Sequence, residues 1–390
     1  MRRSGRSVLP VPIYVTHQSL ERHAGGASAV TAWVLQALCL DFNVLLATPD
    51  PVVDFKRIDH AYGTSLASAP VGLHRLPVPP WLHHVPEGKL KSLRLAATFR
   101  DPVLHRRDGR LIFNTANEMG FLGRSVNYVH CPIRHPRMIA ELYQGRERWL
   151  RLANNAAFKT VSSFDEEGFR RSVCVANSRW TASALRRTYG LEARVVYPPV
   201  TVPIPSPLPL VDRSPGFVCI GRITADKRTS EAIELMDELR GKGHDVHLHI
   251  VGNGGDRYAR RIEAAVRCRP YVTLHRDLSR IKLAALLNEH RFGLHMMRNE
   301  HFGMAVAEMA AAGMLVLAHR SAGPVEILGA GCPLLFADAQ EAAEVAGRLL
   351  DNPSLQAELQ AETAGRRVHE TFHPEAFMRA IRQVVAEALH

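Results

Sequence analysis

Short apolar runs alternate with longer amphipathic segments along most of the chain. The runs that predict strands in the first half are residues 12–17, 42–48, 111–116, 126–131 and 173–178. Those that predict strands in the second half are residues 216–223, 246–252, 272–277, 292–297, 314–319 and 333–337. Segments of helical length separate them, most clearly residues 27–38. This alternation predicts an α/β protein with parallel sheets.

A proline-rich segment divides the pattern in two. Residues 197–215 contain seven prolines, which argue against a helix or a central strand and predict a linker. A chain of 390 residues also exceeds one ordinary core. We therefore predict two doubly wound Rossmann-like domains that face a cleft. Their predicted extents are 1–196 for the first domain, 197–215 for the linker, 216–372 for the second domain and 373–390 for a terminal helix that packs toward the first domain.

Composition narrows the class of protein. No apolar run reaches the roughly 20 residues that span a bilayer, and the apolar stretch after the basic start is too short for a secretory signal. We therefore expect a cytoplasmic protein, at most peripheral at a membrane. The six cysteines contain no CxxC spacing, which is typical of reduced thiols. A net charge of +11 favours anionic partners such as phosphates, nucleic acid or an acidic membrane surface. Because the arginines are dispersed and aromatic residues make up only 7%, nucleic acid is the weaker choice.

Two glutamates flank a predicted strand-to-helix turn. Glu300 follows the strand at 292–297, and a helix is expected to begin near Phe302 and Gly303, with Met304 in its first turn. The first amides of a helix attract a phosphate, and Gly303 allows close backbone approach. Glu308 lies about one and a half turns into the helix. Carboxylates accept hydrogen bonds well from hydroxyls. A nucleotide sugar, which has hydroxyls on both sides of its phosphates, would therefore fit between Glu300 and Glu308. The alternative is that Glu300 caps the helix and Glu308 is solvated.

Two cations occupy the equivalent loop after the strand at 216–223. Gly221 and Arg222 end this strand, and Lys227 begins the next helix. Both side chains could neutralise a departing diphosphate, or they could be ordinary surface charges. The glycines of residues 250–255 lack the full dinucleotide-binding fingerprint and are interpreted as a strand-to-loop turn beside a nucleotide pocket.

The first domain offers candidates at its strand ends. His17 ends the first strand, Gly25 and Gly26 precede a helix, and His130 ends the strand at 126–131. We assign His17, Gly25 and Gly26 to the cleft edge of the first domain, the side of the molecule that would accept the sugar. His130 is either structural, as a single histidine at a strand end usually is, or it faces the cleft and contacts a sugar hydroxyl. The pair of His130 and His135 lacks a third metal ligand. No two aspartates are separated by a single residue, so no Asp-x-Asp metal element exists, and we predict no metal in the site.

These motifs together resemble glycosyltransferase family 4, whose enzymes have the two-domain GT-B fold. The Glu-x(7)-Glu signature of the family matches Glu300 and Glu308, and its Gly-Arg-x(4)-Lys element matches Gly221, Arg222 and Lys227. Arg228 stands where the family often has glycine. Residues 174–327 carry most of the likeness. It is greatest to the branch that extends dolichol-linked oligosaccharides with α-1,2-mannose from GDP-mannose, and the arginine-rich composition suggests a bacterial member.

The resemblance implies a retaining, metal-independent hexosyltransferase that needs no cofactor. Its donor would be a nucleotide sugar, GDP-mannose first and a UDP- or dTDP-sugar as the alternative. Its acceptor would be a hydroxyl of a glycan, glycolipid or small molecule. The implied roles are diphosphate stabilisation by Arg222 and Lys227, sugar contacts by Glu300 and His130, and ribose binding by Glu308. A GT-B phosphorylase, a nucleotide-sugar epimerase and a nucleic-acid-binding protein are weaker alternatives.

Overall fold

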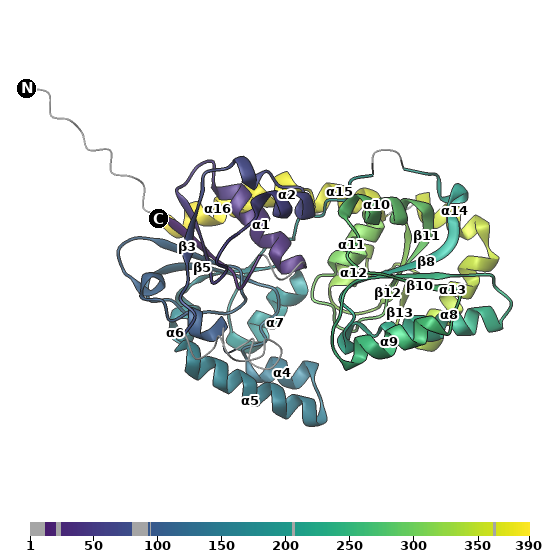
Figure 1. Ribbon diagram of the computed structural model, residues 1–390, viewed down its shortest axis with the longest axis horizontal. Coiled ribbons are helices and arrows are strands. Elements are labelled where there is room, and N and C mark those ends of the chain that lie inside the picture. The colour runs from purple at the N-terminus through teal and green to yellow at the C-terminus, as the bar shows by residue number, and fades with distance from the viewer. Residues whose placement is uncertain (1–11, 21–24, 80–92, 94, 205–206, 362–363) are drawn as a thin grey trace, which may run out of the picture. The chain divides into compact units, whose positions relative to one another are not determined.

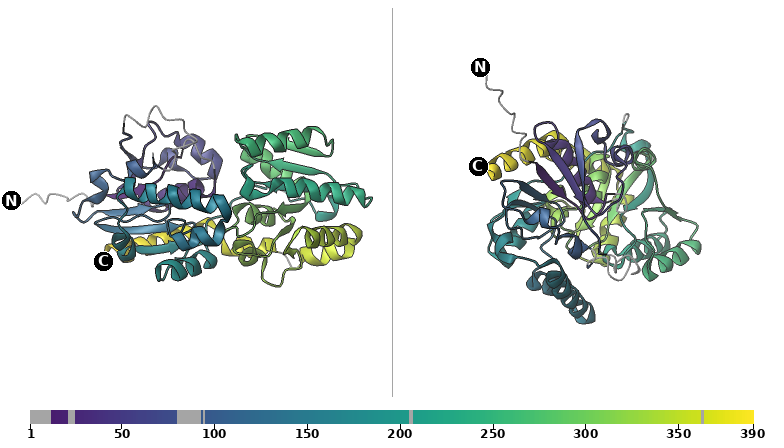
Figure 2. Two further views of the ribbon diagram at one scale, coloured as in Figure 1. Left: turned by 90° about the horizontal axis from the view of Figure 1, so that it is seen from below. Right: turned by 60° about the vertical axis from the view of Figure 1, so that its left-hand side comes forward.

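The chain folds into two compact units. The computed structural model describes residues 12–20, 25–79, 93, 95–204, 207–361 and 364–390. Unit 1 contains Met1–Pro198 together with Glu375–His390, and unit 2 contains Pro199–Pro374. Each unit has one sheet with helices on both faces (Figures 1 and 2). The basic start that was considered as a targeting signal falls mostly outside the described residues.

Unit 1 is built on a parallel sheet of seven strands in the order β3-β2-β1-β4-β5-β6-β7. The strands are β1 (Ile13–Thr16), β2 (Val44–Thr48), β3 (Val71–Arg75), β4 (Leu111–Asn114), β5 (Arg124–Val129), β6 (Val173–Ala176) and β7 (Arg194–Val195). The sequence IYVT of β1 and LIFN of β4 is buried on both faces, as expected for the centre of a parallel sheet. β1 and β4 are neighbours, and the strand order reverses between them.

The helices of unit 1 include one from the end of the chain. They are α1 (Gly26–Leu38), α2 (Phe55–Tyr62), α4 (Pro136–Leu142), α5 (Gly145–Ser162), α6 (Glu166–Arg171), α7 (Arg179–Tyr189) and α16 (Pro374–Leu389). Figure 1 shows α16 beside α1. Phe377, Ile381, Val384 and Val385 of α16 belong to the same buried apolar cluster as residues of α1, β1 and β5. Spacings of three and four residues place these side chains on one face of the helix.

Unit 2 has a parallel sheet of six strands in the order β10-β9-β8-β11-β12-β13. The strands are β8 (Ser214–Ile220), β9 (Leu248–Val251), β10 (Val272–His275), β11 (His290–His295), β12 (Leu315–His319) and β13 (Leu335–Phe336). The helices are α8 (Thr229–Gly241), α9 (Arg257–Arg267), α10 (Arg280–Glu289), α11 (Met304–Ala311), α12 (Gly323–Leu328), α13 (Ala339–Asp351), α14 (Pro353–Ala361) and α15 (Ala364–Thr371). The apolar core of the unit lies between the sheet and α8, α9 and α13.

The proline-rich segment is tied to unit 2 over its described part. The amide of Val200 donates to the carbonyl of Phe372 at 2.9 Å, and the Arg213 guanidinium donates to the carbonyl of Ala312 at 2.8 Å. β8 begins at Ser214, so Pro215 lies in a central strand. At this position the prediction that residues 197–215 contain no central strand is wrong. Pro215 is tolerated there because it is the second residue of the strand, before the ladder to β9 begins.

Local sequence signals fix several helix starts in unit 2. Ser279 caps α10 by accepting from the amide of Lys282, and Asp256 caps α9 by accepting from the amide of Ala259. None of the helices in the described ranges is long and apolar enough to cross a membrane.

Candidate functional site

The predicted donor residues lie at the carboxyl edge of the unit 2 sheet. β8 and β11 are neighbours there, and the strand order reverses between them. Open α/β sheets bind ligands at this position, because the loops on either side of the reversal diverge to opposite faces. The loop after β8 carries Gly221, Arg222 and Lys227, and the loop after β11 carries Glu300 to Gly303.

Glu300 forms the centre of a charged cluster at this edge. The Lys227 ammonium pairs with the Glu300 carboxylate, and His295 Nε2 lies 3.2 Å from the same carboxylate oxygen. The three side chains are largely buried, with exposed fractions of 19% for Lys227, 13% for Glu300 and 3% for His295. His295, the last residue of β11, was not among the sequence candidates. Its position at a strand end next to the Glu-x(7)-Glu element is the signal that could have identified it.

The electrostatics of the cluster favour an ionised glutamate. Burial alone raises the pKa of the Glu300 carboxyl, but the Lys227 ammonium and the His295 hydrogen bond hold this pKa well below its usual range. Burial lowers the pKa of His295, which favours a neutral ring that donates to the carboxylate. The site therefore presents a fixed hydrogen-bond acceptor beside an ammonium group, and this ammonium has two further donors for a ligand.

The start of α11 lies beside this cluster. Gly303 is its N-cap with φ 100°, a conformation that favours glycine, and a Cβ there would lie 3.5 Å from Cγ of Glu300. The amides of the first turn, beginning at Met304, have no acceptor inside the helix and point out of its positive end. The ring of Phe302 is buried against Phe372, with ring centroids 5.3 Å apart. This geometry suits an anion such as a phosphate.

Glycines hold the loops around the site against one another. A Cβ on Gly252 would lie 1.8 Å from the carbonyl oxygen of Gly221, so the glycine turn after β9 packs directly on the loop after β8. A Cβ on Gly323 would lie 2.0 Å from the carbonyl oxygen of Phe302, and the Gly323 amide donates to the Glu300 carbonyl at 2.8 Å. The turn at 250–255 is therefore a packing element beside the site.

Strained backbone gathers at the same edge. Arg228, Asp277, Asn299 and Ala322 have φ between 52° and 55°, and they follow β8, β10, β11 and β12. Such conformations cost about 1–3 kcal/mol each and are retained mainly at functional sites. Arg228 adopts the left-handed conformation at the position where the family often has glycine, which explains the preference for glycine there.

Two other residues predicted to bind the sugar donor, Arg222 and Glu308, differ in exposure. Arg222 is exposed in the loop after β8. Glu308 is half-buried on α11, and burial raises the pKa of its carboxyl against the opposing effect of the Arg280 charge. Burial disfavours the ionised form of this carboxyl, so a hydrogen bond donated by a ligand hydroxyl would stabilise the ionised form. No direct contact within the described residues joins Glu308 to Lys227.

The candidates of unit 1 meet at the equivalent edge of the first sheet. His17 follows β1, and its ring lies 3.0 Å from the Thr115 hydroxyl after β4 and 3.2 Å from the Ser28 hydroxyl on α1. His130 follows β5, and its Nε2 lies 3.2 Å from the Thr115 carbonyl. His17 is only 1% exposed, so its ring supports the loops there. Gly25, an extended and exposed N-cap, and Gly26 begin α1.

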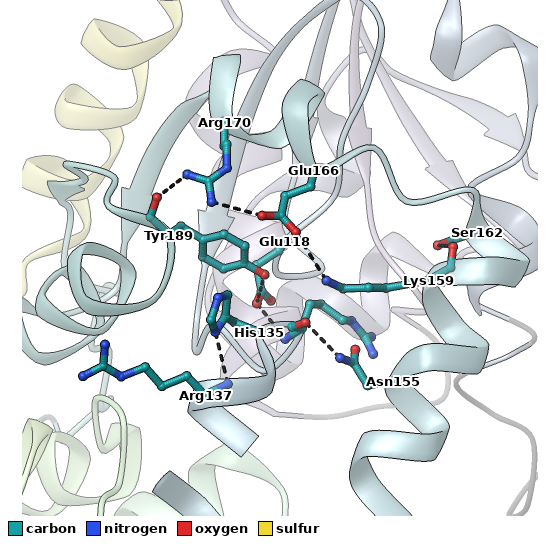
Figure 3. A network of polar contacts seen from close by, with 10 residues as sticks. Glu118, His135, Arg137, Asn155, Lys159, Ser162, Glu166, Arg170 and Tyr189 are labelled. Atoms are coloured by element: carbon teal, nitrogen blue, oxygen red, sulfur yellow. Dashed lines mark hydrogen bonds and ion pairs between the residues drawn. The ribbon is translucent and has the colours of Figure 1, made fainter. Parts of the chain in front are cut away.

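Unit 1 also contains a buried carboxyl outside the predicted set. The Glu118 carboxylate accepts from the Arg134 amide at 2.7 Å and from the Tyr189 hydroxyl at 3.4 Å, while its second oxygen is buried with no hydrogen-bond partner. Figure 3 shows the Tyr189 hydroxyl pointing at Glu118, with the Glu166 and Arg170 pair on the other side of the ring. Burial raises the Glu118 pKa to about 7, although the Arg134 charge opposes this shift.

Among the described residues, one group has the composition of a transition-metal site. His247, His249 and His290 each offer a ring nitrogen, and these atoms lie within 4.8 Å of one another. They lie away from the carboxyl edge, since His290 begins β11 and His247 immediately precedes β9. The sequence interpretation did not single them out.

Part of the second half of the chain is similar to a known family. Residues 204–366 match Glycosyl transferases group 1. The mouse GDP-Man:Man(3)GlcNAc(2)-PP-Dol alpha-1,2-mannosyltransferase is 31% identical over 170 residues, covering 39% of this chain and 35% of that protein. The Dictyostelium discoideum protein of the same name is 25% identical over 301 residues, covering 67% and 59%. The chain thus spans between about a third and three fifths of the length of these relatives.

Solved structures show the same fold over nearly the whole chain. Sucrose-phosphate synthase from Thermosynechococcus elongatus superposes with a TM-score of 0.72 at 18% identity, covering 97% of this chain and 98% of that one. HepE from Anabaena, in complex with UDP and glucose, superposes with a TM-score of 0.67 at 15% identity, covering 96% and 99%. With two parallel sheets of seven and six strands, the predicted GT-B fold class is confirmed.

Proposed function

We propose that the chain, whose residues 204–366 match Glycosyl transferases group 1, is a retaining, metal-independent hexosyltransferase. The proposed donor is GDP-mannose, and the proposed acceptor is a hydroxyl of a glycan, glycolipid or small molecule. The observation that carries the proposal is the cluster of Lys227, Glu300 and His295 beside the start of α11. It combines a cation, a fixed carboxylate and free helix amides at the reversal of the strand order.

Each part of this cluster matches one part of a nucleotide sugar. The amides of α11 and the Lys227 ammonium would bind the diphosphate, and exposed Arg222 would add a second cation to it. The Glu300 carboxylate, held ionised, would accept hydrogen bonds from hydroxyls of the sugar. The half-buried Glu308 carboxylate would accept those of the ribose. His130 of unit 1 is proposed to contact the sugar.

The proposed reaction exchanges one bond to the anomeric carbon for another. The acceptor oxygen bonds to this carbon on the face from which the diphosphate departs, and the bond from carbon to phosphate oxygen breaks. The departing phosphate oxygen takes the acceptor proton, so no protein base is required. Negative charge grows on the diphosphate during this step, and Lys227, Arg222 and the helix amides would stabilise it.

The choice of mannose and guanine rests on the relatives, which are named for GDP-mannose and α-1,2-mannosyl transfer. A UDP-sugar is the second candidate, because the similar HepE structures contain UDP, UDP with glucose, or UDP-glucose. The comparison that separates the two is a thermal-shift panel of GDP-, UDP-, dTDP- and ADP-sugars. A ligand at a hundred times its dissociation constant stabilises the folded state by about 2.7 kcal/mol.

We expect GDP-mannose and GDP to raise the melting temperature most. The matched pair of variants is Lys227→Met and Lys242→Met. Lys242 lies in an exposed ion pair at the end of α8, so its replacement should leave the shift intact, whereas Lys227→Met should reduce it. A response to UDP-sugars alone would select the second candidate. If no sugar nucleotide shifts the transition, or if the two variants respond equally, the proposed donor site is wrong.

A further inference from the structure

Four histidines gather on one face of the unit 2 sheet. His247 immediately precedes β9 and His249 lies two residues further on within it, so their side chains point to the same face. His275 ends β10 on one side, and His290 begins β11 on the other side of β8. The ring centroids of His249 and His290 are 4.6 Å apart, and those of His249 and His275 are 5.0 Å apart.

A glycine in β8 makes this approach feasible. β8 lies between β9 and β11, and a Cβ on Gly216 would lie only 2.2 Å from Nε2 of His247. Any other residue there would occupy the space in which His247 meets His290. With glycine, Nε2 of His247 lies 3.1 Å from Nε2 of His290.

The surrounding hydrogen bonds orient the rings. Nδ1 of His290 lies 2.7 Å from the carbonyl oxygen of Leu286, which can only accept, so Nδ1 carries the proton. In the neutral ring Nε2 then has a free lone pair, and it faces His247. Nδ1 of His249 lies 2.7 Å from Nε2 of His275, and when Nδ1 donates in this contact, Nε2 of His249 keeps a lone pair for a metal. Metal-binding histidines are typically held by such a bond from the second ring nitrogen.

We propose that His247, His249 and His290 bind one divalent transition-metal ion, Zn²⁺ first, with His275 as the outer partner that orients His249. Nitrogen atoms bound to tetrahedral zinc at about 2.0–2.1 Å lie roughly 3.4 Å apart, close to the 3.1 Å between His247 and His290. Three imidazoles without a carboxylate select zinc, nickel or copper over magnesium or calcium. The fourth position is left to a water molecule.

The surroundings of His247 and His249 favour neutral rings, as a metal requires. Burial, together with the neighbouring rings, lowers the pKa of His249 to about 4 and also lowers that of His247. An ion here would join β9 to β11 across β8, near the amino ends of β9 and β11. This position is at the other end of β11 from Glu300, so the ion would stabilise unit 2 without entering the transfer reaction.

The test uses the full chain without a polyhistidine tag, stripped with a chelator and titrated with Zn²⁺ or Co²⁺. We expect one equivalent to bind, with the intense visible absorption of tetrahedral Co²⁺ and a higher melting temperature. His249→Ala and His290→Gln should abolish this binding, and His275→Phe should weaken it by about ten- to a hundredfold. His60→Gln, on the exposed surface of α2, is the control and should bind as the unmodified chain does.

Two results would overturn the proposal. One is the absence of stoichiometric Zn²⁺ or Co²⁺ binding by the unmodified chain, a measurement that does not depend on how the variants fold. The other is binding that survives in folded His249→Ala or His290→Gln protein. The metal readouts are independent of the proposed glycosyl transfer, so each hypothesis can fail alone.

Discussion

The buried carboxyl of Glu118 predicts that the stability of unit 1 depends on pH. Its second oxygen has no partner, and its pKa is raised to about 7 by burial. The informative change is Glu118→Gln, which keeps the acceptor for the Arg134 amide and the Tyr189 hydroxyl but removes the titration. The protonated glutamate and the glutamine are nearly isosteric, so the two chains should behave alike in acid.

The sign and size follow from the pKa shift. Because the folded pKa of about 7 exceeds the ordinary value of 4.5, the folded state binds the proton more tightly than the unfolded state. The resulting stabilisation is complete below about pH 4.5 and is lost as the pH rises through about 7. A shift of this size corresponds to about 3 kcal/mol. Between pH 4.5 and pH 8, the unfolding free energy of the unmodified chain should therefore fall by this amount relative to that of Glu118→Gln.

Tryptophan fluorescence isolates unit 1 in this experiment. All four tryptophans, Trp33, Trp81, Trp149 and Trp180, precede Pro198, so urea titrations followed by this signal report unit 1 alone. Glu167→Gln, an exposed change on α6, is the control and should follow the unmodified chain at every pH. A difference between Glu118→Gln and the unmodified chain that stays constant over this pH range would refute the reasoning. It would mean that water or Arg134 satisfies the ionised carboxyl.

The remaining predictions concern unit 2. Glu308→Ala should weaken donor binding roughly ten- to a hundredfold, measured by calorimetry, and an unchanged affinity would remove Glu308 from the site. Arg222→Ala and Lys227→Ala should each lower the release rate of nucleoside diphosphate at least about tenfold. In the double variant, the increase in the activation free energy of this step should be smaller than the sum of the two single increases. Normal turnover of the single variants would identify these cations as surface charges. Gly252→Ala should destabilise unit 2 by about 1–3 kcal/mol in calorimetric unfolding, because the added Cβ would clash with the Gly221 carbonyl. The control, Gly255→Ala, has open space around the added Cβ and should not destabilise the unit. Equal effects of the two variants would contradict the packing described. EDTA should leave the turnover of folded protein intact, and complete loss restored by metal would contradict the metal-independent mechanism.

The strand pattern was largely readable because buried parallel strands are continuous apolar runs. Every run predicted as a strand overlaps a strand of the structure. The strands that were missed, β3 and β7, are the two edges of the first sheet. β3 has the sequence VGLHR and is only partly buried, so no apolar run marks it, and β7 has only two residues. Edge strands receive less burial, and their sequences carry less of the signal.

The positions of the site residues were predictable to a similar degree, but their contacts were not. The helix predicted to begin near Phe302 and Gly303 begins at Met304, whereas β11 ends at His295, two residues before the predicted strand end. The pairing of Lys227 with Glu300 joins residues 73 positions apart, and it depends on β8 and β11 being neighbours. The histidine cluster likewise needs the sheet order, although His247 and His249 at alternate positions in a strand were a usable signal.

Since α16 completes the core of unit 1, synthesis of the chain has a consequence for folding. The 176 residues from 199 to 374 are made between the first part of unit 1 and this helix. At about 5–20 residues per second, the ribosome needs roughly 9–35 s for that stretch. Throughout this time the apolar surface that will receive Phe377, Ile381, Val384 and Val385 lacks its cover. Unit 2 can fold as soon as it emerges, whereas unit 1, although begun first, is completed last. A chain that stops early would therefore expose unit 1 to chaperones and proteases while unit 2 is already intact.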